Sequence, residues 1–208
     1  MKRNVYDFDG TIYPSQSCVD FYFYCLNKNS NIFMYLITGA KLFFFGMIAH
    51  ELGYKKFRVN NKLCTFLKYL PNLDQLLVEF WSKNKEKITW YLEQNKNTDV
   101  IISVSPRFLI EPAIEILGVK NLICTEVNTN SCNIIGREID LNKNCIIGSV
   151  CSGAEKAIRF REKFPDDSID NFYTDSYRDQ PLIDLSENAY LRDKKGKKLQ
   201  KVRFIKVK

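Results

Sequence analysis

Residues 5–11, with the sequence VYDFDGT, place two aspartates two positions apart between an apolar run and a Gly-Thr turn. If the run forms a strand, alternation puts the Asp7 and Asp9 side chains on one face at its carboxyl end. Open parallel sheets bind their ligands at that edge. Two neighbouring carboxylates repel each other, and an oxygen-preferring cation such as Mg²⁺ relieves the repulsion. Because a strand ending in an Asp-Gly turn is also common without any such site, the stretch alone leaves the function open.

The length and composition are those of an ordinary globular protein. The chain has 208 residues, of which 45% are apolar and 26% charged, and it is long enough to bury a full core. The net charge of +7 is unevenly placed, because residues 192–208 hold nine Lys or Arg against one Asp. This segment therefore carries +8 and residues 1–191 about −1. Basic charge confined to a tail argues against a nucleic-acid partner.

The cysteines and the amino terminus bear on the compartment. Seven cysteines are scattered without a Cys-x-x-Cys pair, and His50 is the only histidine, which argues against a Cys/His zinc site. Several of the cysteines lie in apolar stretches, where a thiol behaves as a small hydrophobe. A strand-like run begins almost at once, so no signal peptide is expected before it. Reduced cysteines without an export signal predict a cytoplasmic protein.

Strand-like and helical segments alternate over much of the chain. The predicted strands are residues 3–8, 100–102, 121–124, 168–173 and 189–191. The predicted helices are 106–117 with Ser105 as cap, 152–164 with Ser152 as cap, and 179–185, and residues 126–139 are predicted to form a hairpin. This alternation predicts an α/β fold, a Rossmann-like and mostly parallel sheet with helices on both faces.

Residues 14–97 interrupt the alternation with helical sequence. The predicted segments are an aromatic-rich helix at 18–27, an apolar stretch at 32–52, and amphipathic helices at 54–70 and 72–94, divided by Pro71. Asn72 has the residue type of an N-cap for the last of these. We therefore expect an α-helical cap, residues 14–97, inserted into a core made of residues 1–13 and 98–208.

Two segments leave a weak membrane-surface contact open. Residues 32–49 approach the length of a membrane span, but Thr38, Gly39 and Lys41 interrupt them, which favours a buried or substrate-lining helix. The basic tail, residues 192–208, would attract anionic lipid. The plainer alternative is that this tail ends the sheet, with its lysines solvating an edge strand.

Polar residues follow the predicted strands or begin the predicted helices at four places along the chain. They are Asp7 with Asp9, Ser103, Lys156, and Asp175 with Asp179. The carboxyl ends of parallel strands meet at one edge, so residues far apart in sequence are expected to share one pocket there. A carboxylate that attacks a phosphoryl group needs its charge neutralised, and both Mg²⁺ and an ammonium do this while stabilising the transition state. The set therefore predicts a phosphate site.

The same residues in the same order resemble the four motifs of the haloacid dehalogenase superfamily, over nearly the whole chain. The Asp-x-Asp-x-Thr motif of its phosphatases is matched by Asp7–Thr11, and the Ser that closes an apolar strand by Ser103. Lys156 matches the motif lysine at a helix start, and residues 175–179 match the acidic loop. This resemblance implies a phosphatase with a Rossmann-like core and an inserted helical cap.

The resemblance also implies chemical roles for the acids. Asp7 attacks phosphorus and forms an aspartyl-phosphate, and Asp9 protonates the leaving oxygen and later activates water. Asp7, Asp175 and the main-chain carbonyl of Asp9 bind Mg²⁺, with Asp179 supporting that set. An acid at the Asp9 position favours phosphoryl transfer over carbon–halogen chemistry.

The remaining implied roles concern phosphate binding and substrate choice. Thr11, Ser103 and Lys156 hold the phosphoryl oxygens, and Thr11 also orients the second motif aspartate; Ser105 is the alternative to Ser103. The helical insertion is similar to the phosphoserine-phosphatase-like branch, yet Gln16 stands where that branch has an acid facing the substrate ammonium. Ser105, followed by proline, stands where that branch has glycine. Gln16 and Ser105 are therefore the candidate substrate-selecting residues.

These departures favour a small or lipid-like phosphate ester over phosphoserine as the substrate. Three alternatives remain beside a phosphomonoesterase. The first is a phosphotransferase, in which an alcohol replaces water, and the second is a lipid phosphatase at a membrane surface. The third is an inactive binding module, against which the complete set of motif residues argues.

Overall fold

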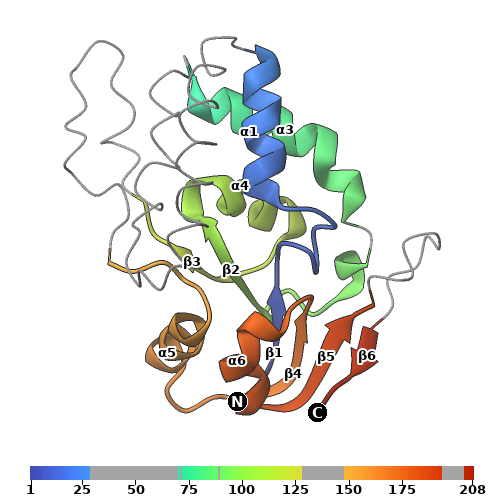
Figure 1. The fold of residues 1–208 in the computed structure, drawn as a ribbon, viewed down its shortest axis with the longest axis vertical. Coiled ribbons are helices and arrows are strands. Elements are labelled where there is room, and N and C mark those ends of the chain that lie inside the picture. The colour runs from blue at the N-terminus through green and yellow to red at the C-terminus, as the bar shows by residue number, and fades with distance from the viewer. Residues whose placement is uncertain (29–69, 71, 89, 128–147, 194–203) are drawn as a thin grey trace, which may run out of the picture.

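The described strands form one mixed sheet at the centre of the fold (Figure 1). The computed structural model describes residues 1–28, 70, 72–88, 90–127, 148–193 and 204–208. Within these residues the strands are β1 (Lys2–Asp7), β2 (Val100–Pro106), β3 (Asn121–Thr125), β4 (Ser168–Thr174), β5 (Ser186–Arg192) and β6 (Phe204–Lys206). Their order is β3-β2-β1-β4-β5-β6, with β6 antiparallel to β5 and every other pair parallel.

Helices cover both faces of this sheet, as predicted. α4 (Arg107–Leu117) packs on one face together with α1 (Ser17–Lys28) and α3 (Leu73–Asn84), and α5 (Ala154–Lys163) and α6 (Gln180–Leu185) pack on the other. Alternation along the strands supplies both cores: on β1, Val5 belongs to the α5/α6 side and Tyr6 to the α4 side. The predicted α/β, Rossmann-like architecture is confirmed.

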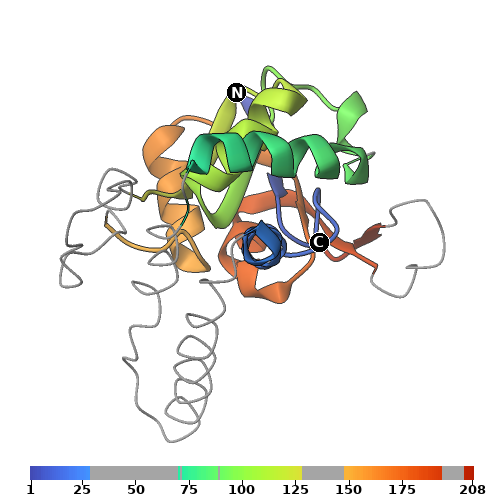
Figure 2. The ribbon, with the colours of Figure 1, turned by 90° about the horizontal axis from the view of Figure 1, so that it is seen from above.

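Helices α1 and α3, which belong to the predicted cap, pack on the same face of the sheet as α4. α1 crosses α3 at a wide angle (Figure 2). At this crossing the rings of Phe21 and Phe80 meet edge-on, with their centroids 5.3 Å apart. Trp81 of α3 donates its indole N–H to the carbonyl of Leu109 in α4 at 2.7 Å. One continuous buried cluster therefore joins α1 and α3 to α4. The boundaries of the cap, residues 14–97, stay a prediction.

Helix α3 begins where the sequence predicted and ends earlier. Asn72 is the N-cap, and its side chain accepts a hydrogen bond from Gln75 N at 3.2 Å. The helix stops at Asn84, ten residues short of the predicted end, and the 3₁₀ turns η3 (Lys85–Lys87) and η4 (Tyr91–Glu93) follow. Asn84 donates its side-chain amide to the carbonyl of Phe80 at 2.7 Å, a local bond of the kind that competes with helical main-chain bonds.

Two predicted helix caps are wrong. Strand β2 continues to Pro106, which is the N-cap of α4 without a side-chain bond, and Ser105 lies inside the strand. The N-cap of α5 is Gly153, with φ of 55°, in place of Ser152. Serine is a common helix cap, but the Ser105 hydroxyl bonds Asp9 instead. The predicted helix end before Gly118 is confirmed, since Gly118 adopts the left-handed conformation.

The end of the chain contributes more sheet than was predicted. The strand expected at 189–191 extends over Ser186–Arg192, and β6 follows it as the outer strand. Lys206 Nζ donates to Asn188 Oδ1 at 2.6 Å, and Lys208 Nζ to the carbonyl of Asp184 at 2.7 Å. The carboxyl end of the basic segment therefore forms the outer strand of the sheet, as the edge-strand alternative predicted.

Several predictions fall on residues outside the described ranges. They concern the apolar stretch 32–52, the helix at 54–70 and most of the hairpin at 126–139. Over the part of the chain that is described, no helix combines the length and the apolar character needed to cross a membrane. Cys25, Cys124 and Cys151 are buried and carry free thiols, as expected for cysteines that act as small hydrophobes.

Candidate active site

The first motif leaves β1 at its carboxyl end and turns sharply. Asp7 is the last residue of the strand, and Asp7 and Asp9 are both buried. Gly10 follows with φ of 79°, and a Cβ at this position would lie 2.3 Å from Oδ2 of Asp175. Only glycine avoids both the unfavourable φ and this collision. The turn therefore brings Asp175, from the loop after β4, against the first motif.

Lys156 joins the first motif to the fourth. The side chain leaves the first turn of α5, and its Nζ lies 2.8 Å from Asp7 Oδ1 and 2.9 Å from Asp179 Oδ2. Thr174 Oγ1 also donates to Asp179 Oδ2, at 3.0 Å. All of these side chains are buried. One ammonium is thus shared by two carboxylates, which leaves an excess of negative charge in a buried site.

Burial and this excess of negative charge shift the pKa values of these groups. Burial raises the pKa of Asp7 to about 7; the charge of Lys156 opposes the shift, and the nearby carboxylate of Asp179 adds to it. Burial alone would lower the pKa of Lys156, but Asp7 and Asp179 together outweigh burial and raise it. Burial also raises the pKa of Asp9, against the hydrogen bonds from Ser105 and Ser17. The raised pKa keeps Lys156 charged beside Asp7 and Asp179.

Asp9 is held from two sides. The main-chain N–H of Ser17, the first residue of α1, donates to Asp9 Oδ1 at 2.6 Å, and Ser105 Oγ donates to Asp9 Oδ2 at 2.5 Å. Ser105 is positioned in turn by its main-chain N–H, which donates to Ser103 Oγ at 3.0 Å. Ser103 and Ser105 are buried. The structure thus places Ser105 on Asp9, the second motif aspartate, through a direct hydrogen bond.

The other predicted residues lie at the margin of this cluster. Thr11 is completely buried, and among the described atoms its hydroxyl has no hydrogen-bond partner. Gln16 is exposed, and its carbonyl accepts the main-chain N–H groups of Val19 and Asp20 at the start of α1. Gln16 directly precedes α1. The structure therefore brings seven of the predicted residues to one edge of the sheet: Asp7, Asp9, Ser103, Ser105, Lys156, Asp175 and Asp179.

Three contributors to the site were missed from the sequence. They are Ser17, Thr174 and Arg192. Ser17 bonds Asp9 and Thr174 bonds Asp179, and neither residue belongs to one of the four motifs. Arg192 belongs to the basic segment 192–208, yet its Nη1 donates to the carbonyls of Gly10 and Thr11, at 2.8 Å each. Burial lowers the pKa of Arg192, and the charge of Asp175 partly offsets that effect. Its position directly after the predicted strand 189–191 was a usable signal, because Ser103 was identified by the same rule.

The predicted cation ligands are compatible with Mg²⁺ in chemistry and charge. Within the described ranges, no three His, Cys, Asp or Glu side chains are grouped as a metal site. The predicted set needs only two, Asp7 and Asp175, plus the main-chain carbonyl of Asp9. These are oxygen donors, which Mg²⁺ prefers, and Asp7 and Asp179 share the single ammonium of Lys156, which leaves an excess of negative charge on this pair. The residues present fit a divalent cation.

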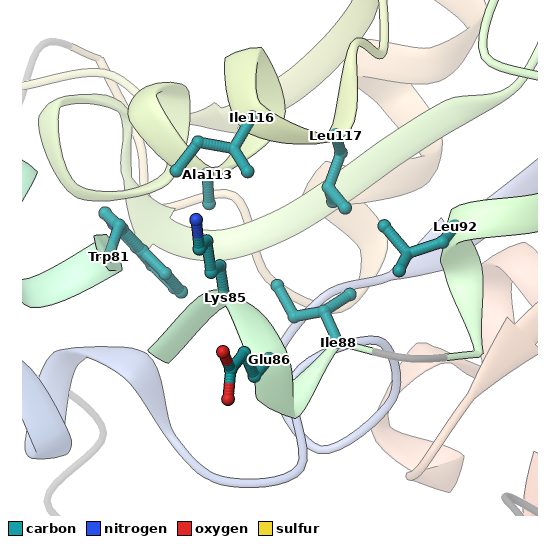
Figure 3. Close-up of a pocket in the computed structure, with 8 residues that line it drawn as sticks. All are labelled: Trp81, Lys85, Glu86, Ile88, Leu92, Ala113, Ile116 and Leu117. Carbon is teal, nitrogen blue, oxygen red and sulfur yellow. The ribbon is translucent and has the colours of Figure 1, made fainter. Parts of the chain in front are cut away.

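A cavity with a different set of lining residues is drawn in Figure 3. It has a volume of about 220 Å³ and lies between α3, the turns η3 and η4, and α4. Its wall is mainly apolar and is formed by Trp81, Lys85, Glu86, Ile88, Leu92, Ala113, Ile116 and Leu117. None of the predicted site residues lines it.

Solved structures with the same fold include proteins related to phosphoserine phosphatase. A protein of unknown function from Bordetella pertussis Tohama I is 17% identical, with 88% of this chain and 86% of that chain covered and a TM-score of 0.66. A phosphoserine phosphohydrolase-like protein from Francisella tularensis subsp. tularensis SCHU S4 is 20% identical, with coverage of 91% and 86% and a TM-score of 0.52. A phosphoserine phosphatase solved as a phospho-aspartyl intermediate analogue is 13% identical, with coverage of 91% and 86% and a TM-score of 0.51.

Sequence comparison identifies the family directly. Comparison with curated protein sequences gives no significant match. The sequence model of the haloacid dehalogenase-like hydrolases matches residues 5–184, which span all four motifs. As the order of the motifs predicted, the protein belongs to the haloacid dehalogenase-like hydrolase family.

Proposed function

We propose that the protein is a Mg²⁺-dependent phosphomonoesterase that works through an aspartyl-phosphate on Asp7. The observation that carries the proposal is the buried ion pair of Asp7 and Lys156, at 2.8 Å, with Asp9 next to it in the same turn. A carboxylate beside an ammonium can approach an anionic phosphoryl group because the lysine offsets the repulsion. The family membership and the fold of the phosphatase structures support the same chemistry.

In the first half-reaction, an Asp7 oxygen attacks phosphorus and the ester bond to the leaving oxygen breaks. Asp9 gives its proton to that leaving oxygen. In the second half-reaction, water attacks the phosphoryl group, Asp9 takes the proton of that water, and Asp7 is released as a carboxylate. Lys156, Ser103 and the buried hydroxyl of Thr11 would hold the phosphoryl oxygens.

The contacts of Asp9 suit this double role. Ser17 N–H and Ser105 Oγ hold its two oxygens separately, which fixes the side chain beside Asp7 without a countercharge of its own. Burial favours the protonated form that the first half-reaction needs. Ser105 therefore contributes by placing Asp9, and Gln16 at the start of α1 is the better candidate for substrate choice.

Asp7, Asp175 and the main-chain carbonyl of Asp9 would hold Mg²⁺, with Asp179 as a supporting acid. When bound, the cation supplies positive charge that offsets the charge of the attacking carboxylate and of the phosphoryl oxygens. The residues themselves restrain the site: Asp179 is fixed by Lys156 and Thr174, and Asp175 lies against Gly10.

The substrate is proposed to be a small or lipid-like phosphate ester in the cytoplasm. Gln16 in place of an acid removes the partner expected for the ammonium of phosphoserine. A phosphotransferase would use the same residues and differ only in the acceptor. Product analysis with added alcohol separates the two, because a transferase forms a new phosphate ester and a hydrolase releases phosphate.

The test is turnover of p-nitrophenyl phosphate with and without Mg²⁺. We expect Asp7→Asn to lower kcat by at least about a thousandfold, because an amide is a far poorer nucleophile. Asp166→Asn is the matched control, since Asp166 is an exposed aspartate after α5. Wild-type turnover that survives chelation of Mg²⁺, or an active Asp7→Asn variant, would refute the proposal.

A further inference from the structure

The Arg192 side chain connects strand β5 to the turn of the first motif, which follows strand β1. It is the last residue of β5, and its Nη1 donates to the main-chain carbonyls of Gly10 and Thr11, at 2.8 Å each. β5 lies next to β4, and β4 leads to Asp175. A single side chain thus spans from the end of one strand to the turn that follows another.

The turn that Arg192 holds has little room to move. Gly10 lies so close to Asp175 that a Cβ would stand 2.3 Å from Oδ2 of that residue. The N–H groups around the turn are bonded locally, Gly10 N to the carbonyl of Ser15 at 3.0 Å and Thr11 N to the carbonyl of Phe8 at 3.2 Å. The two carbonyls, in contrast, are held from outside by the guanidinium.

The choice of arginine fits this task. Its planar group presents several N–H donors in fixed directions, and it keeps its charge when partly buried. Its positive charge also lies close enough to act on Asp175, an acid of the predicted cation set. The same residue therefore restrains the main chain after Asp9.

We propose that Arg192 is a positioning residue of the active site, which fixes the Gly10–Thr11 turn against Asp175 and so sets the Asp9 main chain relative to the Asp175 carboxylate. The inference rests on the proposed phosphatase function. Arg192 acts through the turn and touches neither substrate nor the reacting atoms. Its loss is therefore expected to change cation binding and the chemical step more than substrate binding.

The experiment compares Arg192→Met and Arg192→Lys with a matched control, Arg3→Met. Arg3 lies at the amino end of β1, away from the site, and likewise combines a main-chain carbonyl, Thr98 at 2.9 Å, with an acid, Asp167. For each protein, Mg²⁺ affinity is measured by calorimetry without substrate, kcat and KM with p-nitrophenyl phosphate, and stability by thermal unfolding.

For Arg192→Met we expect Mg²⁺ affinity and kcat each to fall by about 10- to 100-fold, as for other residues that orient metal ligands. KM at saturating Mg²⁺ is expected to stay within about twofold of the wild-type value, because no substrate contact is lost. Arg192→Lys, which keeps the charge, is expected to recover part of the loss. Arg3→Met is expected to lower the melting temperature and leave Mg²⁺ affinity and kcat unchanged.

A folded Arg192→Met that binds Mg²⁺ and turns over substrate like the wild type would overturn the proposal, as would an equal loss of Mg²⁺ affinity in Arg3→Met. If Arg192→Met does not fold, the same measurements on Arg192→Lys decide. A wild type that binds Mg²⁺ but hydrolyses no phosphate ester refutes the proposed function alone, and calorimetry still decides the role of Arg192. A wild type that binds no Mg²⁺ refutes both.

Discussion

The residues around Lys156 are arranged for binding at some expense of stability. Two buried carboxylates, Asp7 and Asp179, share its single ammonium, and Asp9 and Asp175 stand close by. Groups buried without a full complement of opposite charge destabilise the folded state, and such clusters are typical of functional sites. The same excess of negative charge would favour binding of the cation that the proposed function requires.

Gly10 offers a sharp test at the level of single residues. Gly10→Ala places a methyl group on a residue with φ of 79° and within 2.3 Å of Asp175 Oδ2. We expect an unfolding free energy lower by about 1–3 kcal/mol and a kcat lower by at least about tenfold, because Asp175 must move. Chemical denaturation and steady-state kinetics measure the two effects.

Gly118→Ala is the matched control for this change. Gly118 also has a positive φ, 69°, but the nearest atom to its added Cβ is Lys96 Cδ at 3.5 Å, an ordinary contact. This variant is expected to lose about 1–2 kcal/mol of stability and none of its activity. If Gly10→Ala behaves in the same way as Gly118→Ala, contact with Asp175 does not matter to catalysis.

At the scale of elements, Trp81 joins α3 both to α4 and to the first motif. The side chain is completely buried, its indole donates to the Leu109 carbonyl of α4 at 2.7 Å, and its ring meets Phe8, Tyr13 and Phe80 edge-on. Phe8 stands between the two motif aspartates. Helix α3 thus packs directly against the first motif.

Trp81→Phe is expected to lower the unfolding free energy by about 1–3 kcal/mol, through the lost hydrogen bond and the space left behind. Urea denaturation measures the change. Val78→Ala on the same helix is the control: Val78 is 66% exposed, and its truncation is expected to stay within about 0.5 kcal/mol. Equal losses in the two variants would mean that the α3–α4 contact is not important for stability.

The strands and the helix N-cap at Asn72 were predictable because each depends on a local pattern, an apolar run or a capping side chain. The caps at Ser105 and Ser152 were wrongly predicted on the same local rule. Ser105 bonds Asp9, which lies 96 positions away, and the local pattern contains no sign of that partner. Local chemistry thus predicted the elements, and it failed where a side chain serves a distant residue.

At the scale of the whole molecule, the basic segment 192–208 has two parts. Arg192 and residues 204–208 belong to the sheet, where Phe204 lies opposite Arg192 and its ring packs on Trp90 and Tyr173 at 4.8 and 5.1 Å. Residues 194–203 lie outside the described ranges. Composition identified the charge of this segment, but the pairing of β6 with β5 and the reach of Arg192 depend on contacts distant in sequence.

The two parts make different predictions for changes at the end of the chain. A chain that ends at Asp193 loses β6, leaves β5 as an unpaired edge and exposes the rings beneath Phe204. We expect it to lose about 2 kcal/mol or more of stability and part of its activity, since Arg192 loses the strand paired with it. Replacing Lys194, Lys195, Lys197, Lys198 and Lys201 with glutamine removes five charges but keeps β6, and is expected to change neither property.

The glutamine variant also gives the proper test of the predicted weak membrane contact. Truncation would confound charge with the loss of β6, whereas the substitutions change charge alone. Cosedimentation with neutral and anionic vesicles at low and high salt then isolates the electrostatic attraction, which contributes about 1 kcal/mol per lysine near an anionic surface. Binding of the wild type that disappears in the glutamine variant supports a surface role for the segment. If the wild type does not bind anionic vesicles at low salt, the membrane prediction is wrong. The segment then contributes to the sheet, through Arg192 and β6.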